Sequence, residues 1–179
     1  MNRELRESFS CDKSVTVDRE AGVIRGVKLL GESGNCDYPL ATRQKAINLL
    51  EGRRIYANHA PRGSKEPRGY QDALGFPFNI HDRADGLYGD VKVNPKHALA
   101  EQLFWDAENC PHLLGFSITG DGDKRRERGR VIVEAITRID SCDLVTTPAH
   151  GGGLFEGRSM QAKLSAIVES LKASRPGYS

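Results

Sequence analysis

Three polar residues at the ends of predicted strands have the side-chain types of a serine-peptidase site. His59 follows the strand-like segment 54–58, Ser117 lies in an apolar run, and Asp143 precedes Leu-Val. A serine hydroxyl becomes nucleophilic when a neighbouring base takes its proton, and the base needs an acceptor that stabilises its imidazolium. His59, Ser117 and Asp143 can supply these roles in any chain order. Each also has a structural alternative: a loop cap, a packed strand hydroxyl, and a turn cap or arginine partner.

Other chemistries have less support in the sequence. Thr119 stands where a Gly-x-Ser-x-Gly nucleophile elbow needs glycine, and strands do not alternate with helices as in an α/β-hydrolase. The 4 cysteines form no Cys-x-x-Cys pair, so we expect reduced thiols rather than a zinc site or disulfides. Besides His59, the histidines form no metal-binding motif, and we expect surface or capping roles and no cofactor. These histidines are His81, His97, His112 and His150.

The composition is that of a chain with one core and no membrane span. Its 179 residues are 38% hydrophobic, and 26 Lys and Arg against 24 Asp and Glu leave a net charge of +2. This balance argues against a dedicated nucleic-acid binder. No apolar run approaches the ~20 residues that cross a bilayer, and the first residues lack a signal-peptide core. We therefore expect no membrane and no specific nucleic-acid partner. The basic segment 124–128 is expected to be a solvated turn, the alternative being contact with DNA or an acidic scaffold protein.

Glycine-punctuated short segments predict an α+β fold. The chain has 19 glycines, which is typical of many short strands joined by tight turns. The charged segment 121–128 is expected to be the turn of a hairpin. Strands are predicted over 14–17, 22–27, 54–58, 74–80, 86–93, 113–119, 129–139 and 144–147. Seven to eight such strands with about three helices would form a strongly bent sheet or a small β-barrel.

The three predicted helices differ in their signals. Thr42 is expected to cap the first, over 42–50, and Asn94 to cap the second, with a proline in its first turn. Apolar residues at helical spacing over 160–171 predict an amphipathic helix over 159–173.

Several blocks of the sequence resemble the prohead (head-maturation) proteases of tailed phages, which are serine peptidases similar in fold to the herpesvirus assembly protease. The resemblance spans about residues 15–156 and rests on the order of the blocks rather than on any single one. The blocks are 18–27 (DREAGVIRGV), 56–59 (YANH), 85–90 (DGLYGD), 114–117 (LGFS), 141–149 (SCDLVTTPA) and 153–156 (GLFE). It implies a herpesvirus-protease-like protease domain over 1–157, followed by a C-terminal helix and tail over 158–179.

The resemblance also assigns roles to the candidate residues. It places the family's general base on His59 and its nucleophile on Ser117. Backbone N–H groups of residues 150–153 are candidate oxyanion donors, because glycines let a backbone approach a ligand closely. The alternative is that these glycines only form a flexible turn.

The third member of the triad departs from the family pattern. The herpesvirus relatives use a second histidine and some phage enzymes a glutamate, and segment 141–145 contains neither. We predict Asp143, because Ser-x-Asp-Leu-Val recurs in similar sequences and a carboxylate is an acceptor of the right type. Asp140 and Glu134 are the alternatives.

The function implied by the resemblance is that of a serine endopeptidase which cleaves the scaffold and major capsid proteins of a phage or prophage. It would act inside the assembling procapsid, in the bacterial host cytoplasm, with self-cleavage and self-association, and a longer precursor is left open. The departure at the third triad position keeps one rival open, a non-catalytic capsid-assembly or scaffolding protein of the same fold. A metal-dependent hydrolase would instead require chelator-sensitive activity.

Overall fold

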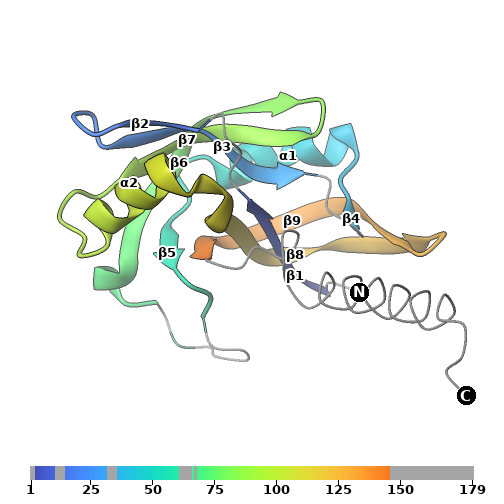
Figure 1. Cartoon of the computed structure of the whole chain (residues 1–179). Coiled ribbons are helices and arrows are strands. Elements are labelled where there is room, and N and C mark those ends of the chain that lie inside the picture. The colour runs from blue at the N-terminus through green and yellow to red at the C-terminus, as the bar shows by residue number, and fades with distance from the viewer. Residues whose placement is uncertain (1–2, 11–14, 32–35, 61–65, 67, 146–179) are drawn as a thin grey trace, which may run out of the picture.

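Nine strands join into one mixed sheet in the computed structural model of the chain (Figure 1). The structure describes residues 3–10, 15–31, 36–60, 66 and 68–145. The strands are β1 (Arg3–Ser10), β2 (Thr16–Asp18), β3 (Val23–Gly31), β4 (Cys36–Asp37), β5 (Ile55–Ala57), β6 (Ala73–Arg83), β7 (Gly86–Val93), β8 (Gly115–Glu127) and β9 (Arg130–Val145). The helices are α1 (Leu40–Leu50) and α2 (Ala100–Asn109), with 3₁₀ turns at Tyr70–Asp72 and Pro111–Leu113.

The sheet is strongly curled but open. Its order is β1-β8-β9-β5-β6-β7-β3-β2, with β4 paired to β9, and β3 comes close to β1 and β8. The predicted α+β class and bent sheet are confirmed, whereas closure into a barrel is wrong because β1 and β2 are separate edges. The strands predicted over 129–139 and from 144 onward form one strand, β9, while β1 and β4 were not predicted. The predicted helix over 159–173 and residues 146–147 lie outside the described part of the chain.

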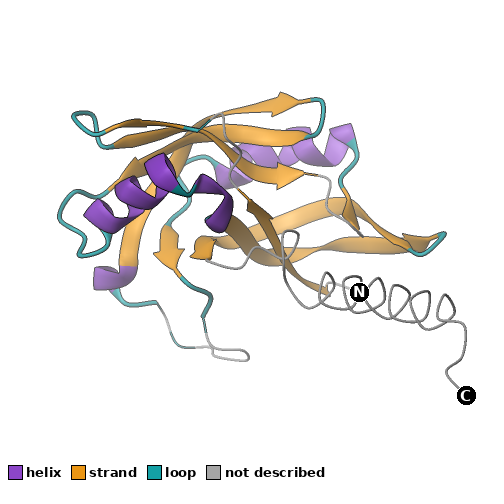
Figure 2. Ribbon diagram, in the orientation of Figure 1, coloured by secondary structure: helices purple, strands orange, loops and turns teal. Residues whose placement is uncertain are grey.

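The core lies within the curl of the sheet, where helices add further apolar surface. Residues of β7 are buried along nearly the whole strand, and α1 packs on β6, β7 and β9. Figure 2 shows α1 and α2 against different parts of the sheet. Neither helix has the length and apolar character needed to cross a membrane. The largest fully buried side chains are Tyr38, Phe116, Ile24, Leu29, Leu30, Leu50, Ile55, Leu74, Leu87, Ile118 and Ile139.

The first predicted helix is confirmed, but its start is not. α1 begins at Leu40, so Thr42 lies inside its first turn rather than at the cap. The Thr42 hydroxyl is buried and lies 3.0 and 2.8 Å from the carbonyl oxygens of Val133 and Glu134. The hydroxyl that the sequence assigns to helix capping is therefore bonded to β9 instead. Gly52 has a φ of 69° just after the helix, as its predicted place requires.

The second helix begins five residues later than predicted, because its cap is Leu99 rather than Asn94 and its first residue is Ala100. The Asn94 side chain accepts the N–H of Lys96, and the His97 ring accepts the N–H of Leu99. These local bonds close turns over 94–99, because short side-chain acceptors compete with helical hydrogen bonding. The buried face of α2 then consists of Ala100, Leu103, Phe104 and Ala107.

The hairpin of β8 and β9 has a much shorter turn than predicted. The predicted turn over 121–128 is wrong, because β8 runs through it to a two-residue turn at Arg128-Gly129. Both turn residues have positive φ, 48° and 82°, which suits the twist of a two-stranded ribbon. Arg125 pairs across the strands with Glu134 at 2.8 Å, so its charge is balanced within the hairpin.

Candidate active site

Strands β5, β8 and β9 bring the predicted site residues to one face of the sheet. The antiparallel register of β8 and β9 sets Ser117 opposite Asp143, and the parallel register of β5 and β9 sets Tyr56 opposite Asp143. Paired residues share a face, with Cα atoms about 5 Å apart. Thr119, two residues beyond Ser117 on β8, lies on that same face. The face therefore carries the hydroxyls of Ser117 and Thr119 beside the Asp143 carboxylate.

A turn at Asn58 directs His59 toward this face. Asn58 has a φ of 63°, and its N–H donates to the carbonyl of Leu144 at 2.8 Å. Asparagine is one of the few non-glycine residues that adopt this left-handed conformation readily. The chain consequently leaves β5 and places the His59 ring beside β9.

We expect Asn58→Gly to keep the stability of the chain, whereas Asn58→Val should lose about 1–2 kcal/mol of unfolding free energy. The branched valine is strained at positive φ, whereas glycine is not. Urea unfolding of both variants measures this difference. Equal stability of the two would show that backbone strain at residue 58 is unimportant.

His59 and Asp143 form the central contact of the site. The His59 Nδ1 lies 2.8 Å from the Asp143 Oδ2. The Asp143 side chain is only 1% exposed and the His59 ring 27% exposed. Because the carboxylate is the acceptor, Nδ1 carries the proton and Nε2 keeps a lone pair that can take a proton from a substrate or nucleophile. This is the arrangement of a general base and its orienting acid.

The two alternative carboxylates lie elsewhere. Asp140 is paired with Arg138 at 3.0 Å, and Glu134 is paired with Arg125 at 2.8 Å. Both are about half exposed. Asp143 is therefore the carboxylate of the three that contacts His59.

Ser117 is adjacent to this pair but not bonded to it. Its side chain is fully buried, and its Oγ makes no hydrogen bond with any described residue. The hydroxyl that contacts the pair is that of Thr119, which lies 3.3 Å from the Asp143 Oδ2 and 3.5 Å from the His59 Nδ1. Thr119 was not predicted as a site residue, although its place two residues after Ser117 was a usable signal.

Arg68 also reaches the site and had no sequence signal of its own. It lies in the polar segment 61–69, over which the sequence predicts neither a strand nor a helix. Its Nη1 lies 3.5 Å from the Asp143 Oδ1. Both of these atoms are buried, and neither makes a hydrogen bond with a described residue.

The described histidines other than His59 lie apart from any metal-binding group. No group of three His, Cys, Asp or Glu among the described residues could hold a metal ion. The His81 ring contacts the Asn79 carbonyl and the Arg83 Nε. His150 and the predicted oxyanion segment 150–153 lie outside the residues that the structure describes.

The cysteines give no alternative nucleophile among the described residues. Cys36 and Cys142 are buried and Cys110 is partly buried. Burial, followed by the neighbouring Asp106 carboxylate, raises the pKa of Cys110 above its ordinary value. A thiol held in its protonated form is a poor nucleophile.

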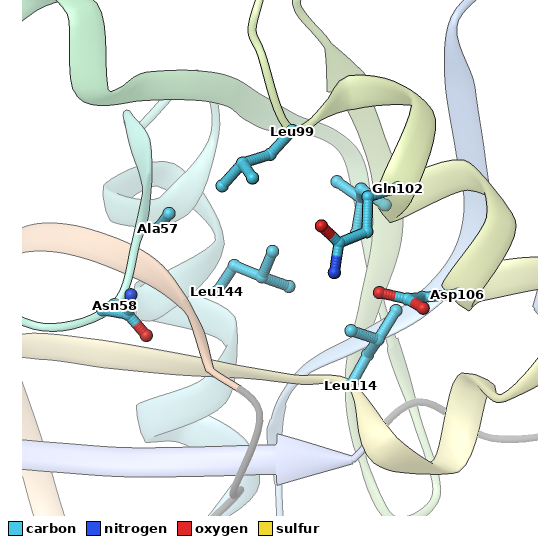
Figure 3. Close-up of a pocket in the computed structure, with 8 residues that line it drawn as sticks. Ala57, Asn58, Leu99, Gln102, Asp106, Leu114 and Leu144 are labelled. Carbon is cyan, nitrogen blue, oxygen red and sulfur yellow. The ribbon is translucent and has the colours of Figure 1, made fainter.

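An apolar pocket lies at the same strand ends, between them and α2 (Figure 3). It has a volume of about 100 Å³, and one water occupies about 30 Å³ of liquid. Ala57 and Leu144 precede and follow the site residues along the chain and pair with each other across β5 and β9. Because side chains alternate along a strand, they lie on the face opposite Asp143. The lining residues are Ala57, Asn58, Leu99, Gln102, Leu103, Asp106, Leu114 and Leu144.

Comparison with solved structures finds the bacteriophage T4 capsid assembly protease, gp21. The two chains align with a TM-score of 0.61 and 18% sequence identity, over 82% of this chain and 99% of that one. No protein-family profile and no curated protein matches this chain. At this identity the similarity is one of fold.

Proposed function

We propose that the chain is a serine endopeptidase that acts in phage procapsid maturation. The observation that carries the proposal is the His59–Asp143 hydrogen bond beside Ser117, on a fold similar to that of a capsid assembly protease. Each residue has the type that its role requires: a nucleophile, a base and an acceptor.

The proposed reaction is acyl transfer in two steps. The Ser117 Oγ attacks the scissile carbonyl carbon while the His59 Nε2 takes the hydroxyl proton. His59 then gives this proton to the leaving amine, which departs and leaves an acyl-serine ester. Water, deprotonated by His59, hydrolyses the ester and regenerates Ser117. Because Ser117 is buried in the free chain, substrate binding has to expose its Oγ.

The oxyanion that forms at each step needs fixed donors. Backbone N–H groups of residues 150–153 are proposed for this role. No metal or other cofactor takes part in the proposed reaction.

The proposed substrates are the scaffold and major capsid proteins of the same phage. The support is the fold shared with a protease of capsid assembly. We place the activity inside the procapsid in the host cytoplasm, with self-cleavage and self-association of the enzyme.

Intact-mass spectrometry of scaffold and capsid proteins tests this function. They are incubated with the wild-type chain or with Ser117→Ala, under conditions that assemble procapsids. Defined fragments with the wild type alone are expected, and their masses identify the cleavage sites. If neither protein produces fragments, the rival function, a non-catalytic assembly or scaffolding protein of this fold, replaces the proposal.

The apolar pocket is proposed to hold one aliphatic side chain of the substrate. Its apolar wall fits such a side chain, while Gln102 and Asp106 supply polar groups for the flanking peptide. Two of its lining residues, Asn58 and Leu144, are the immediate sequence neighbours of His59 and Asp143.

Leu99→Trp should therefore raise KM several-fold and leave kcat within about twofold, because a filled pocket weakens binding and leaves the reacting groups in place. Leu99 is 38% exposed, so the larger side chain is tolerated. Steady-state cleavage of the capsid protein measures both constants. Leu40→Trp, at an exposed position of α1, is the matched control. Equal KM values for the two variants would exclude the pocket from substrate binding.

A further inference from the structure

One guanidinium joins the two halves of the His59–Asp143 pair. We infer that Arg68 is a positioning residue which holds the Asp143 carboxylate and the backbone before His59 in one arrangement. The inference rests on the proposed function, because it assigns Arg68 a part in organising that site. Arg68 itself contacts none of the reacting atoms.

The contacts of Arg68 reach both sides of the pair. On one side its Nη2 donates to the carbonyls of Ala57 and Asn58, at 3.2 and 3.0 Å. These are the last two carbonyls before His59. On the other side its Nη1 lies 3.5 Å from the Asp143 Oδ1. A single rigid group thus bridges the backbone that precedes His59 and the carboxylate that orients its ring.

The guanidinium of Arg68 stacks on the ring of Tyr56. The Arg68 Cζ lies 4.4 Å from the Tyr56 ring centroid. Tyr56 is the residue of β5 that pairs with Asp143. Stacking on an aromatic face leaves the edge of the guanidinium free to donate, so its plane and its direction are both constrained.

Burial makes the loss of the Arg68 contact with Asp143 energetically costly. The Asp143 carboxylate is 1% exposed and the Arg68 side chain 19% exposed. The Oδ2 of Asp143 is already shared by His59 and Thr119. The Arg68 guanidinium lies within ion-pair distance of the other oxygen, and removing the partner of a buried charge is costly. Without Arg68, we expect the carboxylate to rotate or shift toward water and to leave His59 less well oriented.

A lysine cannot reproduce this set of contacts. The guanidinium is planar and presents five N–H groups in a fixed fork, whereas an ammonium is a point charge on a flexible stem. A lysine at position 68 could approach Asp143 or the two carbonyls, but it could not stack on Tyr56 while bridging both.

Arg68→Ala should lower kcat about 10²-fold with little change in KM, which is the size of effect expected for a small displacement of reacting groups. Arg68→Lys should recover only part of the loss, and millimolar guanidinium should partly restore Arg68→Ala by filling the vacated space. Steady-state cleavage of the capsid protein gives these values. Arg83→Ala is the matched control, because Arg83 also stacks on a tyrosine, at 4.3 Å from the Tyr88 ring. It should retain full activity.

A second readout needs no substrate. The shared proton of the His59–Asp143 bond should give a far-downfield proton NMR signal in the wild type and in Arg83→Ala. We expect this signal to be lost or shifted in Arg68→Ala, and in Arg68→Gln if the alanine variant fails to fold.

The two proposals can fail separately. A wild-type chain that cleaves nothing overturns the proposed function, and the NMR comparison still tests Arg68. Unchanged kcat and an unchanged signal in Arg68→Ala overturn the positioning role. A rise in KM alone also overturns it, since Arg68 would then bind substrate. Full activity of Arg68→Lys would show that a point charge is sufficient and would overturn the bridging geometry.

Discussion

Ser117→Ala is expected to lower kcat/KM by about 10⁶-fold, to the level that substrate binding and oxyanion stabilisation alone can sustain. We expect no loss of fold stability in this variant. The Ser117 Oγ is buried and makes no hydrogen bond with a described residue, so its removal deletes a desolvated polar group. We therefore expect the melting temperature to stay constant or to rise slightly. A loss of activity without a loss of stability is the result that identifies a nucleophile.

Thr119 provides the matched control for this variant, since its hydroxyl lies on the same face of β8 and contacts His59. That hydroxyl is directed to the Asp143 Oδ2 and faces the His59 Nδ1, which is already occupied. Thr119→Val keeps the shape of the side chain and deletes one neutral hydrogen bond, worth about 1 kcal/mol. We expect a loss of roughly tenfold or less in kcat/KM. If Thr119→Val were inactive and Ser117→Ala active, the nucleophile would be Thr119.

Asp143→Asn is expected to lower kcat about 10⁴-fold, as loss of the orienting acid does in a serine-peptidase triad. The asparagine amide can donate to the His59 Nδ1 and thereby select the tautomer in which Nε2 carries the proton. That tautomer cannot deprotonate Ser117. The variant should also lose about 1–3 kcal/mol of unfolding free energy, because the contact of Arg68 with a charged oxygen disappears.

Asp140→Asn is the control for this second variant. Asp140 is three residues away on the same strand, is about half exposed, and pairs with Arg138. An exposed ion pair contributes little to stability. The free energy of unfolding and the activation free energy of cleavage should therefore each change by less than about 1 kcal/mol. Cleavage rates and urea unfolding measure both effects. If the two asparagine variants lost equal activity, Asp143 would have no special role.

These variants also separate the proposed protease from the rival assembly protein. An assembly protein of the same fold would tolerate Ser117→Ala, Thr119→Val and Asp140→Asn alike, since none of them removes a large packing group. In such a protein the variants would differ in stability alone, with the largest loss for Asp143→Asn. The contrast between activity and stability, rather than either alone, decides between the two functions.

The local sequence was sufficient to predict most of the strands and the residue types of the candidate site. Short segments punctuated by glycines and turns predicted β6 and β7 closely, because hairpin strands depend on neighbouring residues. His59, Ser117 and Asp143 were identifiable by side-chain chemistry and by resemblance. The predictions were wrong where another hydrogen-bonding arrangement was more favourable than the one that the local sequence suggested. Asn94 caps a turn instead of α2, and the charged segment 121–128 is paired strand instead of turn.

The tertiary structure alone decided which of these residues meet. The parallel pairing of β5 with β9 joins residues more than 80 positions apart, and no local pattern specifies such a register. That register places His59 on Asp143 rather than on Asp140 or Glu134. The antiparallel register of β8 and β9 brings the Thr119 hydroxyl to Asp143, and the segment that follows β5 brings the Arg68 guanidinium there. Sequence patterns determine which face a side chain takes within its own strand, whereas the pairing of distant strands determines which side chains share that face.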